Sequence, residues 1–331
     1  MHPLQRKQGQ ARRGSRTGPE PALTVPLHRS ATMAVLPPFA ITGTTQLAGV
    51  LGDPVRHSLS PALHNAAIRE LGLNWVYLAL PASAETLEVV VQGLEAMGCR
   101  GLSVTIPHKH AVAALCRELS PLARRVGAVN TLVPLEGGGW HGTNTDVEGF
   151  MAPLREDRWQ GKEALVLGCG GSARAVVAGL VELGLGQITV AARRPESLEA
   201  FAADCRPWAP QLRTLAWASG LQPALSAAAL VVNTTPVGMA AAGDPAAAER
   251  SPLSPAELDA LTPGSCVYDL IYIPRPTRLL QGAAERGCRI VDGLEMLVQQ
   301  GAAALRLWSG QETLPIAAMR HAALEQLKGG H

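Results

Sequence analysis

The segment ALVLGCGGSARA, residues 164–175, decides the fold that the sequence predicts. It starts with four consecutive apolar residues, as in a strand buried on both faces of a parallel sheet. The glycine turn that follows is Gly168-x-Gly170-x-x-Ala173, and an apolar helix over 176–183 comes next. Gly168 permits a tight turn, Gly170 lets a pyrophosphate approach the backbone, and Ala173 lets the helix pack closely. This order of strand, turn and helix predicts a dinucleotide-binding Rossmann fold, with a ligand-free αβ turn as the alternative.

The end of the next strand indicates which dinucleotide is bound. The apolar strand over 188–192 is followed by Arg193 and Arg194, about 20 residues after the glycine turn. NAD-binding folds place an acid here for the ribose hydroxyls, whereas guanidinium groups suit a 2′-phosphate. We therefore expect NADP, with an ordinary surface arginine pair as the alternative. Further strands are expected at 229–233, 265–270 and 289–292, and helices at 251–261 and 276–286.

Upstream, the stretch GLSVTIPHKH, residues 101–110, delivers a lysine at the end of a strand. Leu102 and Val104 have the alternation of a buried strand that stops at Pro107, and Lys109 follows directly. A rigid strand fixes the origin of such a side chain, which suits a reactive group. A lone lysine is more often an ordinary surface residue, so Lys109 needs partners elsewhere in the chain.

Two serines mark a candidate anion site. Ser60 before Pro61, followed by apolar residues at helical spacing, predicts a helix with Ser60 as its N-cap. Ser58 precedes it by two positions. Backbone N–H groups and the dipole at a helix N-terminus favour an anion, so two hydroxyls there suit a carboxylate. Helix capping alone is the alternative.

Two further polar residues need an explanation. Asn130 lies in an otherwise apolar predicted strand, 127–133, and a buried amide must find hydrogen-bond partners. Asp146 precedes an amphipathic segment over 147–154. The end of the sheet could satisfy Asn130, and Asp146 could cap a helix. With strands at 47–51 and 75–80 and helices at 84–97 and 108–119, this half of the chain predicts an α/β unit with a largely parallel sheet.

Composition limits the class of protein. The 331 residues suggest two domains, and a net charge of +2 with 17% charged residues gives no strong attraction to nucleic acid or membrane. No apolar run approaches the ~20 residues of a membrane helix. The six cysteines form no CxxC pair and the nine histidines no HExxH motif. We therefore expect reduced thiols, no metal site and a cytoplasmic location.

The first ~40 residues differ from the rest, since several Arg and Lys face a single acid, Glu20. Such a segment is expected to be disordered, and it lacks the apolar core of a secretory signal. It is either a transit peptide that directs import into an organelle or an extension ahead of a true start at Met33. Both interpretations stay open.

Taken together, motifs across the chain resemble those of the shikimate dehydrogenase family, from about residue 48 to residue 327. They occur in the order GDPVRHSLSPALHN, GLSVTIPHK, GAVNTL, GTNTDVEGF, GCGGSARA, NTTPVGM, YDLIYIP and DGLEMLVQQ. The resemblance implies reversible NADPH-dependent reduction of 3-dehydroshikimate to shikimate in aromatic amino-acid biosynthesis. An NAD-using quinate/shikimate dehydrogenase and a non-catalytic nucleotide-binding relative are the alternatives.

The resemblance also implies roles for individual residues. Lys109 and Asp146 match the catalytic pair. The implied substrate-binding residues are Ser58, Ser60, Thr105, Lys109, Asn130, Asp146, Tyr272 and Gln300. The implied cofactor-binding residues are Gly168, Cys169, Gly170, Gly171, Ser172, Ala192, Arg193, Arg194, Leu270 and Gly293. The sequence departs from the family at Ala192 and Arg194, where an Asn-Arg-Thr triplet is usual, at Cys169 for Ala and at Leu270 for Met.

The expected organisation has four parts. A disordered basic extension spans 1–42, a substrate-binding α/β domain 43–146, and a Rossmann NADP-binding domain 147–292. Helices over 293–331 are expected to pack back on the substrate domain, with the active-site cleft between the two domains. The expected partners are the small-molecule substrate and no nucleic acid, and the chain is expected to be a monomer or homodimer.

Overall fold

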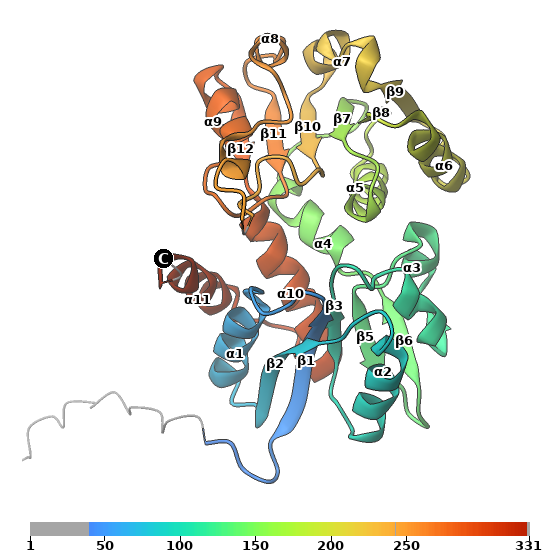
Figure 1. Cartoon of the computed structure of the whole chain (residues 1–331), viewed down its shortest axis with the longest axis vertical. Helices are drawn as coiled ribbons and strands as arrows, with labels where there is room; N and C mark the ends of the chain where they lie inside the picture. Colours follow the sequence, from blue (N-terminus) through green and yellow to red (C-terminus); the bar gives the residue numbers. More distant parts are fainter. Residues whose placement is uncertain (1–39, 242, 330–331) are drawn as a thin grey trace, which may run out of the picture. The chain divides into compact units, whose positions relative to one another are not determined.

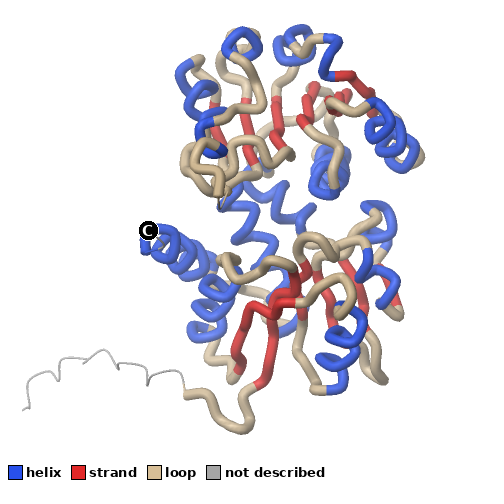
Figure 2. Tube along the Cα trace, in the orientation of Figure 1, coloured by secondary structure: helices blue, strands red, loops and turns tan. Residues whose placement is uncertain are grey.

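A computed structural model describes residues 40–329 of the chain, except residue 242 (Figure 1). All but the last three residues of the predicted basic extension lie outside this part. The strands form two separate six-stranded sheets, with helices packed around each (Figure 2). None of the helices in the described part is long and apolar enough to cross a bilayer.

The sheet that contains β7, the strand before the glycine turn, is entirely parallel, in the order β12-β11-β10-β7-β8-β9. This is the strand order of a dinucleotide-binding fold, with β7 and β10 adjacent where the order reverses. The Rossmann prediction is therefore confirmed. The strands are β7 (Glu163–Leu167), β8 (Gln187–Ala192), β9 (Leu212–Ala216), β10 (Leu230–Asn233), β11 (Cys266–Asp269) and β12 (Arg289–Val291).

The helices around this sheet differ from prediction in two respects. The predicted helix over 251–261 is present but shorter, since α8 spans only Pro255–Leu258. Pro255 lacks the N–H that an earlier start would require, and a Ser254–Glu257 capping box sets the start. The sequence did not predict β9, α6 and α7. The helices are α5 (Gly171–Glu182), α6 (Pro195–Cys205), α7 (Gln222–Ala227), α8 (Pro255–Leu258) and α9 (Arg278–Glu285), with 3₁₀ turns at Trp217–Ser219 and Ala247–Glu249.

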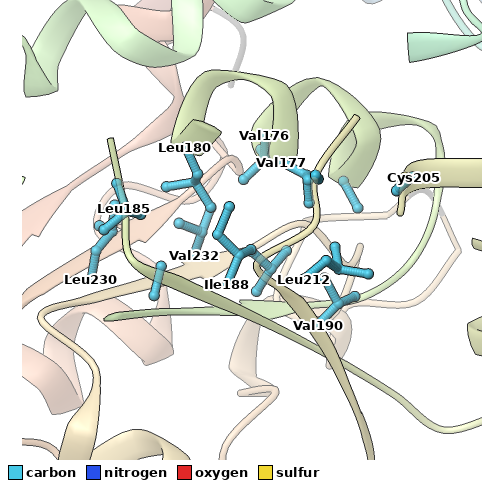
Figure 3. Packing of buried hydrophobic residues seen from close by; sticks show 14 of the residues in the cluster. Val176, Val177, Leu180, Leu185, Ile188, Val190, Cys205, Leu212, Leu230 and Val232 are labelled. Carbon is cyan, nitrogen blue, oxygen red and sulfur yellow. The ribbon is translucent and has the colours of Figure 1, made fainter. Parts of the chain in front are cut away.

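One face of the parallel sheet packs against α5 in a closely filled core (Figure 3). Val176 and Leu180 of the helix meet Ile188, Val190 and Val232 of the strands, all fully buried. Burying each such side chain contributes about 1.5–3 kcal/mol relative to leaving it exposed. This packing holds the N-terminus of α5 in place at the end of β7.

The first sheet has the order β2-β1-β3-β5-β6-β4. Three of its pairings are parallel (β1–β2, β1–β3 and β4–β6), and the β3–β5 and β5–β6 pairings are antiparallel, so the prediction of a mostly parallel sheet holds. The strands are β1 (Gln46–Gly52), β2 (Trp75–Pro81), β3 (Leu102–Val104), β4 (Glu118–Leu119), β5 (Thr131–Pro134) and β6 (Trp140–Thr143).

Two segments of this half differ from the prediction. The expected helix over 108–119 is wrong: a short 3₁₀ turn, η1 (Ala111–Leu115), is followed by β4, because residues 118–119 pair with β6. The expected strand over 127–133 starts only at Thr131, since Gly127 ends a helix in the left-handed conformation, φ 68°. The helices here are α1 (Ser60–Glu70), α2 (Leu87–Ala96) and α3 (Pro121–Val126).

The remaining helices connect the two sheets and finish the first. The connection contains α4 (Asp146–Met151) and the 3₁₀ turn η2 (Ala152–Leu154). After β12 the chain returns through α10 (Gly293–Ser309), which packs on α4, and α11 (Ile316–Gly329), which packs on α1. Trp308 of α10 is buried in the first sheet's core, and its indole N–H donates to the Leu132 carbonyl at 3.0 Å.

Candidate active site

A lysine–aspartate ion pair lies where the first sheet meets the connecting helix α4. Lys109 Nζ donates to Asp146 Oδ2 at 2.6 Å, and both side chains are largely withdrawn from solvent, with 23% and 10% exposed. The Asp146 backbone N–H bonds instead to Asn144 Oδ1 at 3.0 Å. Helix capping therefore does not account for Asp146, because its carboxylate faces the lysine.

The Asn130 amide orients this carboxylate. Its Nδ2 donates to Asp146 Oδ1 at 2.8 Å and to Thr145 Oγ1 at 3.1 Å. Its Oδ1 accepts from the Thr145 backbone N–H at 2.7 Å and from Thr131 Oγ1 at 2.9 Å. Asn130 is 2% exposed and lies just before β5, so the end-of-sheet explanation is half right. The Asn130 amide bonds to residues at the start of β5 and after β6, and it occupies Oδ1 of Asp146. Oδ2 of Asp146 is therefore left for Lys109.

The turn that carries Lys109 is anchored on both sides. The Lys109 carbonyl accepts from the Val129 N–H at 2.8 Å. The buried His108 imidazole lies 2.6 Å from the Ala82 carbonyl, and the His110 imidazole lies 2.6 Å from the Gly127 carbonyl. Sequence reasoning missed both anchors, because a histidine beside a lysine carries no signal of which carbonyl it meets.

The two serines lie at the start of α1, but the capping arrangement differs from the prediction. Ser60 is the first helical residue rather than the N-cap, and Ser58 Oγ accepts the Ser60 backbone N–H at 3.2 Å. The predicted N-cap role of Ser60 is therefore wrong by one position. Since Ser58 provides the side-chain acceptor, the nearly buried Ser60 hydroxyl is not used for capping.

The other predicted substrate residues lie on neighbouring elements. Thr105 follows β3, and its backbone N–H donates to the Leu51 carbonyl at 2.9 Å. Tyr272 follows β11 and packs against the core of the first sheet, and burial raises the pKa of its phenol. Gln300 lies on α10 beside Gly149 of α4, where a Cβ would overlap its side chain. Among the eight predicted substrate-site residues, side-chain hydrogen bonds join Lys109, Asn130 and Asp146.

The glycine turn has the geometry that a pyrophosphate requires. Gly168 has φ 104° and lies against Thr234 and Thr235, so a side chain is excluded both by conformation and by space. Gly170 is the extended N-cap of α5, and nothing lies within 4 Å of the Cβ it lacks. An open backbone at a helix N-terminus binds an anionic group. Gly171 and Ser172 form the first turn of α5.

Two arginines, Arg174 and Arg194, lie close to this turn, and Arg193 precedes Arg194. Arg193 and Arg194 are exposed directly after Ala192, the last residue of β8. Burial raises the pKa of the Cys169 thiol, and the Arg194 and Arg174 guanidinium groups oppose that rise, which places both near the turn. Arg174 is held at 2.5 Å by Asp204. The residues present therefore fit a dinucleotide with an additional phosphate.

Leu270 and Gly293 contact each other at the end of the parallel sheet. A Cβ on Gly293 would overlap the Leu270 carbonyl, so only glycine fits there. Nearby, Asp269 is fully buried and accepts from Asn233 Nδ2 at 2.9 Å and Thr277 Oγ1 at 2.8 Å. Desolvation raises the pKa of Asp269 to about 6. Sequence reasoning missed this anchor, for which the only signal was an acid at the end of an apolar strand.

Comparison with known proteins decides the family. Two family models match: "Shikimate dehydrogenase substrate binding domain" over residues 50–132, and "Shikimate 5'-dehydrogenase C-terminal domain" over residues 293–324. A shikimate dehydrogenase (NADP(+)) of Synechococcus sp. (strain JA-2-3B'a(2-13)) is 52% identical over 287 residues, which cover 87% of this chain and 98% of the relative. The chain belongs to the shikimate dehydrogenase family.

Other family members are similar over the same extent. The shikimate dehydrogenase (NADP(+)) of Synechocystis sp. (strain ATCC 27184 / PCC 6803 / Kazusa) is 50% identical over 296 residues, covering 87% of this chain and 98% of its own. The structure of the Thermus thermophilus enzyme in complex with NADP(H) and shikimate has a TM-score of 0.74 at 36% identity, covering 85% of this chain and 99% of its own. The resemblance inferred from the motifs is confirmed.

Proposed function

We propose that the protein is an NADP-dependent shikimate dehydrogenase, which reversibly reduces 3-dehydroshikimate to shikimate in aromatic amino-acid biosynthesis. The observation that carries this is the Lys109–Asp146 pair, held by Asn130 in a chain of this family. We assign substrate binding to residues 43–146, NADP binding to residues 147–292, and a supporting role to the C-terminal helices. All six cysteines are free thiols, which supports a cytoplasmic location.

The reaction needs a group that exchanges a proton with the substrate oxygen. A bound NADP(H) would supply or accept a hydride, and negative charge would then develop on the ketone oxygen during reduction. The Lys109 ammonium is held by Asp146, stabilises that charge, and donates a proton to the oxygen. In the reverse direction the pair receives the alcohol proton. Because Asn130 holds the other Asp146 oxygen, the carboxylate keeps the lysine oriented throughout.

The serines at the start of α1 would bind the substrate carboxylate. Ser58 and Ser60 lie at the helix N-terminus, where the dipole and the hydroxyl groups favour an anion. We assign Thr105, Tyr272 and Gln300 to binding of the hydroxyl groups on the substrate ring and to enclosing the bound substrate. Polar groups from the segments after β3 and β11 and from α10 would then surround the substrate.

The cofactor site favours NADP over NAD. Arg193 and Arg194 would bind the 2′-phosphate, while the turn over 168–172 takes the pyrophosphate and Ala192, Leu270 and Gly293 line the rest of the site. An NAD-using quinate/shikimate dehydrogenase would gain nothing from two arginines at this place. Steady-state assays with NADP⁺ and NAD⁺, each against shikimate and quinate, discriminate the two. Dependence on NAD⁺ at equal or lower KM would contradict the proposal.

Substitution of Lys109 tests the catalytic assignment. We expect Lys109→Ala to lower kcat for shikimate oxidation by roughly 10²–10⁴, the usual size of a general acid–base contribution, with a modest change in KM. Lys328→Ala, which removes an exposed lysine of α11, is the matched control and should retain wild-type turnover. Near-wild-type turnover of Lys109→Ala would refute the role, and no shikimate-dependent NADP⁺ reduction by the wild type would favour a non-catalytic relative.

A further inference from the structure

Behind the start of α1 lies a group of buried polar side chains that no role described above uses. Among the described residues, the Tyr77 hydroxyl, the Ser103 hydroxyl and both His64 nitrogens are buried and make no hydrogen bond. Buried polar groups in folded proteins are normally paired, so three such residues together need an explanation. Tyr77 and His64 are fully buried, and Ser103 is 6% exposed.

The sheet register places Tyr77 and Ser103 on the same face of the first sheet. On β1, Ala48 pairs with Tyr77 of β2, and Val50 pairs with Ser103 of β3. Residues two apart on β1 share one face, so the tyrosine and the serine lie on the same side of the sheet. β1 lies between the strands that carry Tyr77 and Ser103, and Ala48 is the β1 residue paired with Tyr77.

Helix α1, which packs on this face of the first sheet, places Ser60 near Tyr77. Ser60 and His64 are four residues apart on α1 and therefore lie on one face of the helix. The His64 ring stacks on the Tyr77 ring, with centroids 4.1 Å apart and 13° between planes. The hydroxyls of Ser103 and Ser60 lie close enough to the phenol to lower its pKa, although burial raises that pKa by more. The phenol therefore stays protonated and has Ser60 and Ser103 as its polar neighbours.

We propose that Tyr77 is a positioning residue for Ser60. When the Ser60 hydroxyl donates to a substrate carboxylate, its oxygen accepts from the Tyr77 O–H, and the Tyr77 oxygen accepts from Ser103. A hydroxyl that accepts one hydrogen bond while donating another is polarised and held in a single orientation, which strengthens its hydrogen bond to the anion. This inference rests on the proposed carboxylate role of Ser60 and adds the two residues behind it.

The decisive variant is Tyr77→Phe, which removes only the hydroxyl. We expect KM and the directly measured Kd for shikimate to rise roughly 3- to 10-fold, with kcat and the KM for NADP⁺ within twofold of wild type. Tyr268→Phe is the matched control, because Tyr268 is also fully buried with no partner for its hydroxyl, but lies in β11 against Phe150. It should leave the shikimate Kd unchanged. Ser103→Ala should raise the Kd for shikimate, as Tyr77→Phe does.

A double-mutant cycle separates positioning from a general loss of structure. In a Ser60→Ala background the Tyr77 hydroxyl has no Ser60 hydroxyl to donate to. Adding Tyr77→Phe should therefore not change the shikimate Kd further. If Ser60→Ala weakens shikimate binding and Tyr77→Phe does not, the inference is overturned while the proposed function stands. Equal effects of Tyr77→Phe in both backgrounds also overturn it. If Ser60→Ala itself leaves the Kd unchanged, the carboxylate role of Ser60 is what fails.

Discussion

Replacing His64 should make the free energy of unfolding less dependent on pH between pH 7 and pH 5. His64 lies in α1 with neither ring nitrogen hydrogen-bonded, and burial lowers its pKa from 6.5 to about 3. Between these two values the unfolded chain binds a proton at this site and the folded chain does not. The free energy of unfolding therefore falls as the pH drops below 6.5, by about 2 kcal/mol at pH 5.

The measurement compares urea unfolding at pH 7 and pH 5 for the wild type and His64→Leu. Leucine does not titrate, so the variant should lose about 2 kcal/mol less than the wild type over this interval. Any packing change in the variant affects both pH values equally and cancels in the difference. His321→Leu, which removes an exposed histidine of α11, should reproduce the wild-type loss. If His64→Leu loses as much stability as the wild type, His64 is not the buried titrating group.

Three further substitutions test other parts of the site. Asn130→Ala should lower kcat about 10²-fold, because the Asp146 carboxylate, proposed to be catalytic, loses the amide that orients it, and kcat near wild type in steady-state assays would contradict this role. Arg194→Ser should raise the KM for NADP⁺ about 10-fold or more and leave that for NAD⁺ unchanged, and an equal rise for both cofactors would exclude 2′-phosphate recognition. Gly293→Ala should destabilise the protein by about 2 kcal/mol in urea unfolding, since its Cβ overlaps the Leu270 carbonyl, and an unchanged midpoint would show that α10 shifts freely.

Features formed by residues that are close in the sequence are predictable from the sequence alone. The strand, glycine turn and helix over 164–175 are contiguous, and each residue's role follows from its own backbone conformation and size. For this reason the Rossmann fold and the strand, glycine turn and helix order were predicted correctly. The long helix α10 was equally predictable, because its apolar residues recur at helical spacing directly after the Asp292 cap.

Pairings between distant residues could be seen only in the tertiary structure. Residues 118–119 form a strand because β6 lies beside them, although the local sequence favours a helix. Asn130 orients Asp146 across 16 positions, and Tyr77 meets the Ser60 helix only through the register of β1, β2 and β3. Local sequence sets backbone preference, whereas the partner of a buried polar group depends on which strands become neighbours. The sequence by itself therefore determined the fold class and the catalytic candidates, and the tertiary structure decided how they are held.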